Sequence, residues 1–245
     1  MTLIVSHKDD AVHKAWMFRV LRGVADDVAL VKVLVFKGGT CAAMRGFLDR
    51  FSVDLDFDYI GSVDEMDAVR KKLERLFSDL GLTVKDASKE VPQYFLKYPA
   101  KEGQRTTLKF EATNLLSKAN KIEKVRFVDI DRVLLSHTIE TMFAHKLVAL
   151  VDRFERHGSI ASRDVYDIHR FFMSGYSYNE EVIQDRRGVP AHEYLKELYS
   201  FIDVRITDMI INQDLNVLLK PDQFQKIRLV LKEETLTFIR DELRG

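Results

Sequence analysis

The stretch from Val31 to Tyr59 constrains the fold of this chain more than any other. It opens with the short apolar, β-branched run Val31–Phe36, which is typical of a buried strand. A Gly-Gly-Thr turn follows, then a short helical pattern over Ala42–Phe47 and an alternation of apolar and polar residues over Phe51–Tyr59. Alternation with a period of two indicates a strand with one buried face. The stretch therefore predicts a strand, a glycine turn, a short helix and a second strand.

Acidic residues occupy one face of the second predicted strand. Successive side chains of a strand point to opposite faces, so the polar side of this strand comprises Ser52, Asp54, Asp56 and Asp58. Asp54 and Asp56 would lie a few ångströms apart, and both stay ionised only if a cation binds between them. Their oxygen ligands suit a hard ion, magnesium or manganese. Two aspartates at a strand end also occur as a solvated edge or a turn, so this pattern alone leaves both interpretations open.

Two further features add to the metal-site hypothesis. Gly38-Gly39-Thr40 leaves a strand and enters a helix, where free backbone N–H groups and the helix dipole attract phosphate oxygens, although a tight turn without a ligand explains the same residues. Glu111 lies in the predicted strand Thr106–Thr113. If this strand pairs with Phe51–Tyr59, Glu111 completes a set of three carboxylates, which can hold two metal ions.

The remaining patterns predict an α+β protein. Before residue 131 we expect helices at Asp10–Asp27 and Val63–Leu80 and strands at Gln93–Tyr98, Thr106–Thr113 and Val125–Ile130, with a polar turn at 99–104. After it the strand signals stop, and we expect helices at Thr138–Arg156, Arg163–Met173, His192–Leu219, with a break near Asn212, and Pro221–Arg244. This division predicts an α/β domain over 1–134 and a helical domain over 135–245.

Composition excludes several classes of protein. Almost half of the residues are apolar and the 38 basic residues equal the 38 acidic ones, which indicates a globular chain. No apolar run approaches the roughly 20 residues that span a bilayer, and the start MTLIVSHKDD lacks the pattern of an export signal, so we expect no membrane partner and a cytoplasmic location. The single cysteine, Cys41, excludes internal disulfides and a thiolate zinc site, and we interpret it as a packing residue.

The charges are segregated along the chain. Residues 49–67 hold seven acidic residues against one basic residue, whereas residues 85–126 hold ten basic residues against five acidic ones. An acidic spot and a basic stretch suit a site that holds cations and a polyanion together. Two solvated faces would give the same counts.

The helical half contributes two ambiguous positions. Lys146 lies at the edge of the apolar stripe of the helix Thr138–Arg156. In one interpretation its aliphatic stem covers apolar surface and its ammonium lies in water. In the other its ammonium approaches a triphosphate. Asp164 and Asp167 follow the polar loop HGSIAS with the spacing of a helix-start capping pair.

The stretch Lys37–Phe57, KGGTCAAMRGFLDRFSVDLDF, resembles the first motif of the AbiEii/AbiGii toxin family, whose pattern runs K-G-G-T, a short helix and R-x-S-x-D-x-D. That family belongs to the DNA polymerase β-like nucleotidyltransferase superfamily. The matching positions are Gly38, Gly39, Thr40, Arg50, Ser52, Asp54 and Asp56. Glu111 resembles the third carboxylate, Lys146 in AHKLVAL the motif lysine, and RDVYD at 163–167 the final motif. Thr40 replaces the usual serine, and Phe143 and His145 replace the small or acidic residues expected beside Lys146.

This resemblance implies a polymerase β-like nucleotidyltransferase domain with a mixed sheet flanked by helices, followed by a helical domain that closes the active-site cleft. It implies transfer of a nucleoside monophosphate from an NTP to an acceptor hydroxyl, with two Mg²⁺ (or Mn²⁺) ions and release of pyrophosphate. Asp54 and Asp56 would hold both ions and Glu111 the ion that activates the hydroxyl. The implied nucleotide-binding set is Lys37, Gly38, Gly39, Thr40, Arg50, Ser52, Lys146 and Asp164. Gly39 and Thr40 would bind the β- and γ-phosphates, Arg50 and Ser52 would orient the motif, and Lys146 and Asp164 would position the nucleotide.

The resemblance also implies a biological setting. Members of the family are toxins of toxin–antitoxin systems and of abortive infection by phage, they are neutralised by a separate antitoxin protein, and a tRNA 3′ end is a reported kind of acceptor. Two other interpretations stay open. One is a module that keeps the fold and binds RNA or antitoxin without catalysis, and the other is a phosphatase that uses the first aspartate of its D-x-D as a nucleophile.

Overall fold

The structure is a computed structural model that describes residues 10–88, 90–101, 105–114 and 116–244. The segment 1–9, on which the expectation about an export signal rests, and positions 102–104 of the predicted polar turn lie outside these residues. The chain forms two compact units, the first comprising residues up to Leu116 with Ile122–His137, and the second comprising Ser117–Lys121 with the residues from Thr138 on. The domain boundary expected after residue 134 falls inside the last strand of the first unit.

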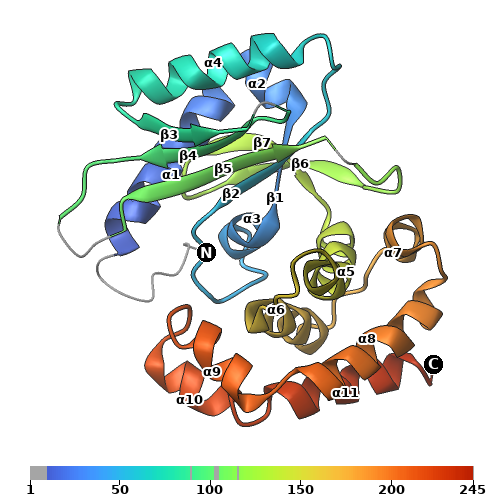
Figure 1. Ribbon diagram of the computed structural model, residues 1–245. Helices are drawn as coiled ribbons and strands as arrows, with labels where there is room; N and C mark the ends of the chain where they lie inside the picture. Colours follow the sequence, from blue (N-terminus) through green and yellow to red (C-terminus); the bar gives the residue numbers. More distant parts are fainter. Residues whose placement is uncertain (1–9, 89, 102–104, 115, 245) are drawn as a thin grey trace. The chain divides into compact units, whose positions relative to one another are not determined.

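A seven-stranded mixed sheet forms the centre of the first unit (Figure 1). Its spatial order is β3-β4-β5-β2-β1-β7-β6. β2 is antiparallel to β1 and parallel to β5, and β1 is parallel to β7. The strands are β1 (Leu34–Lys37), β2 (Leu55–Tyr59), β3 (Thr83–Ala87), β4 (Gln93–Lys97), β5 (Thr107–Thr113), β6 (Ile122–Phe127) and β7 (Arg132–His137).

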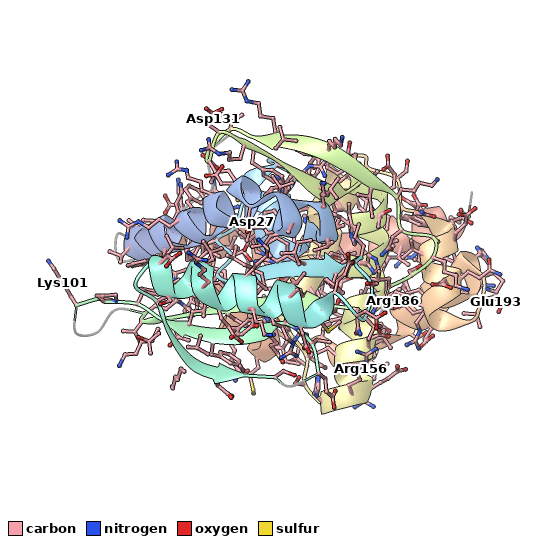
Figure 2. The ribbon with its side chains drawn as sticks, turned by 90° about the horizontal axis from the view of Figure 1, so that it is seen from above. Asp27, Lys101, Asp131, Arg156, Arg186 and Glu193 are labelled. Carbon is pink, nitrogen blue, oxygen red and sulfur yellow. The ribbon has the colours of Figure 1, made fainter. Side chains whose placement is uncertain are left out.

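Four helices accompany this sheet, namely α1 (Asp10–Asp26), α2 (Val28–Val33), α3 (Gly38–Met44) and α4 (Met66–Asp79). Figure 1 shows α2 and α4 on one side of the sheet and α3 on the other. In the view from above, α1 and α4 lie side by side (Figure 2), and the two helices pack against each other. The expected helices at Asp10–Asp27 and Val63–Leu80 are therefore confirmed, the second with a later start.

An aromatic core anchors the middle of the sheet. The ring of Phe57 in β2 lies 5.2 Å from that of Phe36 in β1 and 4.9 Å from that of Phe110 in β5. Phe77 of α4 packs 5.5 Å from Phe110, so the apolar face of β2 is the one that α4 covers. Because side chains alternate along a strand, Asp56 and Asp58 belong to the opposite face. The apolar side of the predicted strand is thus confirmed.

The first unit departs from the expected elements at four places. The helix expected at Ala42–Phe47 is α3, which runs over Gly38–Met44, so Gly38, Gly39 and Thr40 form the first turn of this helix rather than a turn before it. Val31–Val33 belong to α2 rather than to β1, because Asp27 caps that helix by accepting hydrogen bonds from the backbone N–H groups of Ala29 and Leu30 at 2.8 and 3.1 Å. β2 begins at Leu55 rather than Phe51. The strand expected at Val125–Ile130 ends at Phe127, and a hairpin turn with Asp131 at φ 53° leads into β7; Figure 2 shows Asp131 at the tip of this hairpin.

Two strands were not expected at all, namely β3 and β7. Every residue of β3 is exposed, so this edge strand carries no apolar alternation that a sequence pattern would reveal. β7 follows β6 after a four-residue turn. Its residues, RVLLSH, lie between the predicted strand Val125–Ile130 and the predicted helix Thr138–Arg156, where no element was expected.

The second unit is helical in its described residues, as expected. Its helices are α5 (Ile139–His157), α6 (Ser162–Met173), α7 (Glu180–Arg187), α8 (Ala191–Arg205), α9 (Asp208–Leu215), α10 (Pro221–Ile227) and α11 (Leu231–Glu242). α11 packs against α6 and α8. The break expected near Asn212 lies instead at Ile206 and Thr207, where the Thr207 hydroxyl caps α9, and the short polar helix α7 was not expected. Within the described ranges, no helix has the length and apolar character that crossing a membrane requires.

Candidate active site

Three charged residues lie in one row across the centre of the sheet. Lys37 of β1 is the register partner of Asp56 in β2, and Asp56 is the register partner of Glu111 in β5. Register partners on adjacent strands project to the same face. The pairing of the strand that carries Glu111 with the aspartate strand is therefore confirmed, and it brings Glu111 beside Asp56.

The electrostatic environment of Asp56 shows that the acidic residues act on one another. Burial and the charges of Asp54 and Glu111 raise the pKa of Asp56, whereas the charges of Lys109 and Lys37 lower it, and the net result is a pKa of about 6. Like charges that approach closely disfavour ionisation of one of them. Asp54, Asp56 and Glu111 thus belong to one electrostatic site, and the repulsion within it raises the pKa of Asp56.

Lysines balance this site in the structure. The ammonium of Lys109, two residues before Glu111 on the same face of β5, forms an ion pair with Glu111. Among the residues that the structure describes, no three His, Cys, Asp or Glu side chains are grouped as ready-made metal ligands. The donor set nevertheless fits a divalent cation, because carboxylate oxygens are the ligands that magnesium takes and a cation would relieve the repulsion at Asp56.

The two glycines at the start of α3 lie directly against these side chains. Gly38 has φ 80°, and a Cβ added there would lie 2.4 Å from Oδ2 of Asp56. A Cβ on Gly39 would lie 2.9 Å from both Nη2 of Arg50 and Oγ of Ser52. The structure therefore brings Gly38, Gly39, Arg50, Ser52 and Asp56 together. It requires glycine at position 38 both for the backbone conformation and for the close approach.

Two residues of the predicted nucleotide-binding set hold the chain that leads to Asp54. The Thr40 side chain is fully buried, and its Oγ1 donates to the carbonyl oxygen of Asp54 at 2.6 Å. Arg50 is buried as well, and its Nη1 donates to the carbonyl oxygen of Phe51 at 3.0 Å. The orienting role expected of Arg50 agrees with this contact, whereas the hydroxyl of Thr40 is engaged by the protein itself.

Lys37 and Asp58 belong to a second ionic group on the same face. Lys37 forms an ion pair with Asp58 and donates to Oγ1 of Thr113 at 2.9 Å. Nε2 of His137, at the end of β7, donates to Oδ2 of Asp58 at 2.8 Å. Burial alone would raise the pKa of Asp58, but the hydrogen bond from His137 and the charge of Lys37 outweigh it and lower the pKa to about 2. The charge of Lys37 and the hydrogen bond from His137 therefore compensate the carboxylate of Asp58 within the protein.

Replacing Asp58 by asparagine is expected to destabilise the protein by about 3 kcal/mol at pH 7, because it removes one partner of a buried ion pair. The folded-state pKa lies below the ordinary value of 3.8, so the stabilisation is complete above pH 4 and is lost as the pH falls towards 2. Urea unfolding between pH 7 and pH 3 measures this difference. Asp79→Asn, at an exposed pair 3.8 Å from Arg75, is the control and should cost less than about 0.5 kcal/mol. Equal costs in the two variants would contradict the assignment.

In the second unit, Lys146 lies in a buried cluster. Its Nζ is 2.7 Å from Oδ2 of Asp167 and 3.4 Å from Oδ1 of Asp164, and Nε of Arg153 is 3.1 Å from Oδ2 of Asp164. Both aspartates are almost fully buried. The capping interpretation of Asp164 and Asp167 is wrong, because α6 begins at Ser162 without a side-chain cap and both carboxylates face these cations. The ammonium of Lys146 is therefore paired with carboxylates of the protein rather than lying in open water.

Lys146→Met is expected to cost about 3 kcal/mol of stability, because it leaves the buried carboxylate of Asp167 without that ammonium. Adding Asp167→Asn in the same chain should recover most of this loss, since it removes the buried charge as well. Urea unfolding of the two single variants and the double variant measures the coupling. Strictly additive costs would contradict the ion pair as the source of the effect.

Several residues of these sites were missed or misjudged from the sequence. No motif marks the contacts made by His137, Thr113, Arg153 and Lys109. Phe143 stacks 5.0 Å from Phe171 and so belongs to the helical core. Cys41 is fully buried and burial raises its pKa to about 12, in agreement with a packing residue.

A mixed sheet with acidic residues on adjacent central strands and two glycines at the start of α3 packed against Asp56 and Arg50 agrees with the nucleotidyltransferase fold that the sequence predicts. The chain belongs to the AbiEii family, since the family model described as "Nucleotidyl transferase AbiEii toxin, Type IV TA system" matches residues 19–234. It is thus a nucleotidyltransferase of a toxin family, and that family pairs each toxin with an antitoxin.

Solved structures agree with this fold. JHP933 from Helicobacter pylori is similar with a TM-score of 0.61 and 21% sequence identity, over 98% of this chain and 95% of that chain. MenT4, a nucleotidyltransferase toxin from Mycobacterium tuberculosis, is similar with a TM-score of 0.59 and 18% identity, over 95% of this chain and 84% of that chain. A comparison with curated protein sequences found no match.

Proposed function

We propose that this toxin transfers a nucleoside monophosphate from an NTP to an acceptor hydroxyl at the 3′ end of a tRNA, with magnesium (or manganese) as its cofactor. The observation that supports this proposal most strongly is that Asp56 and Glu111 are register partners on adjacent strands and that Asp56 also experiences the charge of Asp54. The cytoplasm supplies both substrates, and blocking tRNA in this way suits a toxin that aborts phage infection until its antitoxin binds.

The proposed chemistry relies on charge placement. Asp54 and Asp56 would hold two metal ions, and Glu111 one of them. When bound, magnesium neutralises the phosphate oxygens and lowers the pKa of the acceptor hydroxyl. In the reaction the hydroxyl oxygen forms a bond to the α-phosphorus, the bond from that phosphorus to the bridging oxygen breaks, and pyrophosphate leaves with the electron pair while the hydroxyl proton passes to solvent.

Other residues of the chain hold the site and the nucleotide. Gly38 and Gly39 allow the backbone to approach Asp56, Arg50 and Ser52, which keeps the aspartates oriented before substrate arrives. The backbone N–H groups at Gly39 and Thr40 are the proposed ligands of the β- and γ-phosphates. Lys37, held by Asp58, adds positive charge beside Asp56. Lys146 and Asp164 are proposed to position the nucleotide, with Arg153 and Asp167 holding that pair in place.

The test incubates the purified protein with each α-labelled NTP, magnesium and total tRNA, and follows label in RNA and release of pyrophosphate. Wild type is expected to label RNA with at least one NTP, and Asp56→Asn is expected to give no label. Mass spectrometry of RNA and protein recovered after expression identifies which molecule gains a nucleotide. Label on protein but not on RNA would overturn the tRNA acceptor and keep the transfer reaction.

The ion pair between Lys109 and Glu111 favours a second candidate, a module that binds RNA or its antitoxin without catalysis. In such a module the lysine would permanently replace the metal ion. Gel-shift binding of tRNA by wild type, with neither label nor pyrophosphate from any NTP, would support this candidate and overturn the first.

A further inference from the structure

The segment that leads to Asp54 lies outside the strands of the sheet. Residues 51–54 precede β2, which begins at Leu55, and buried backbone carbonyls outside a ladder need other partners. Side chains from three parts of the chain supply them: Arg50 to the carbonyl of Phe51 at 3.0 Å, Thr40 to that of Asp54 at 2.6 Å, and His13 of α1 to that of Val53 at 2.7 Å.

The protonation of His13 follows from its two partners. The Val53 carbonyl only accepts, so Nε2 of His13 carries the proton and donates it. The hydroxyl of Tyr98 lies 2.6 Å from Nδ1 and donates to it; burial raises the pKa of Tyr98 to about 12, which keeps that hydroxyl protonated. The His13 side chain is only 1% exposed, and burial lowers its pKa to about 4. His13 is therefore a neutral imidazole in a single tautomer.

We propose that His13 is a positioning residue for Asp54, which acts by fixing the peptide unit between Val53 and Asp54. A peptide unit is planar, so a hydrogen bond that orients the Val53 carbonyl also orients the nitrogen and Cα of Asp54, and with them the direction of its side chain. Thr40 holds the next carbonyl, so the backbone is held on both sides of the Asp54 Cα. This inference rests on the proposed function only in taking Asp54 as a metal ligand.

His13 lies before residue 19, where the match to the family begins, and the motif that contains Asp54 starts at Lys37. The contact between His13 and Val53 joins residues 40 positions apart. Tyr98, which fixes the tautomer, lies 85 positions from His13. The positioning group thus comes from α1 and from the residue that follows β4, both outside the motif that it serves.

A matched pair of variants separates positioning from simple packing. His13→Gln keeps an N–H group close to the position of Nε2, whereas His13→Leu fills the space without a donor. We measure Mn²⁺ affinity of the full-length protein by isothermal titration in the absence of nucleotide, together with thermal unfolding of each variant. Loss of a group that orients a metal ligand typically weakens metal affinity by about 10- to 100-fold. We expect about a tenfold loss in His13→Leu, a loss of less than about threefold in His13→Gln, and an intermediate loss in Tyr98→Phe.

The outcomes separate this inference from the proposed function. Equal losses of Mn²⁺ affinity in His13→Gln and His13→Leu would show that His13 only fills space, and unchanged affinity in His13→Leu would exclude any role in positioning; either result overturns the inference. Absence of Mn²⁺ binding by wild type would overturn it together with the metal site. Mn²⁺ binding that follows the expected order, without nucleotide transfer to any acceptor, would support the inference and overturn the proposed function.

Discussion

Asp56→Asn is expected to lower nucleotidyl transfer by at least about 10³-fold while leaving the protein no less stable at neutral pH. The loss of activity is expected because Asp56 is a proposed ligand of both metal ions. The unchanged stability is expected because an asparagine of equal size removes a partly buried charge that desolvation and the carboxylates of Asp54 and Glu111 disfavour. Pyrophosphate release and urea unfolding measure the two quantities on one protein sample.

The pH dependence of this difference has a defined sign. The folded-state pKa of Asp56, about 6, lies above the ordinary value of 3.8, so the folded protein binds more protons than the unfolded chain between these values. In wild type this contribution lowers stability as the pH rises from about 4 to 6. The stability of Asp56→Asn relative to wild type should therefore increase over that range in metal-free buffer, by up to about 3 kcal/mol, and Mg²⁺ should reduce the difference. An asparagine variant that is inactive because it unfolds would contradict this account.

Gly38→Ala is expected to abolish activity and to destabilise the first unit by about 3 kcal/mol. A residue with a side chain pays about 1–2 kcal/mol to adopt a positive φ, and at position 38 the new Cβ would also lie 2.4 Å from the carboxylate oxygen of Asp56. Relief of this contact requires that Asp56 or the start of α3 moves, and either movement disturbs the site. Thermal unfolding and pyrophosphate release test both parts.

Gly81 provides the matched control for Gly38. It has φ 76° at the end of α4, and no heavy atom lies within 4 Å of a Cβ built there. Gly81→Ala should therefore show only the backbone cost of about 1–2 kcal/mol and keep full activity. If Gly81→Ala and Gly38→Ala lost the same stability and both remained active, the close approach of Gly38 to Asp56 would not be required for activity.

Much of the site was predictable because its residues follow local periodicity. The alternation in Phe51–Tyr59 and Thr106–Thr113 placed Asp56 and Glu111 on strand faces, and the structure pairs those strands in register. The helical second half was likewise visible as a local pattern, whereas the glycines expected to form a turn open helix α3. The expected roles of the site residues, however, rest on the family resemblance and remain proposals.

The parts that were not predicted depend on long-range contacts. Asp58 is compensated by His137, 79 positions away, and the loop before β2 is held by His13, 40 positions from Val53. The Asp164–Asp167 spacing matched a helix cap, but the tertiary contact with Lys146 prevailed. The exposed edge strand β3 carries no apolar signal. A sequence pattern predicts which residues share a face of one helix or strand. It could not predict His137, His13 and Lys146 as partners, because each lies on a different element from the residue that it contacts.

The most direct test of the metal site is anomalous diffraction from crystals grown with Mn²⁺ and a non-hydrolysable NTP. The account predicts Mn²⁺ peaks within coordination distance of the carboxylates of Asp54 and Asp56, one of them also bound by Glu111, with the Lys109 ammonium released from Glu111. Crystals that hold nucleotide but show no Mn²⁺ at these three carboxylates, with Lys109 still paired to Glu111, would contradict it.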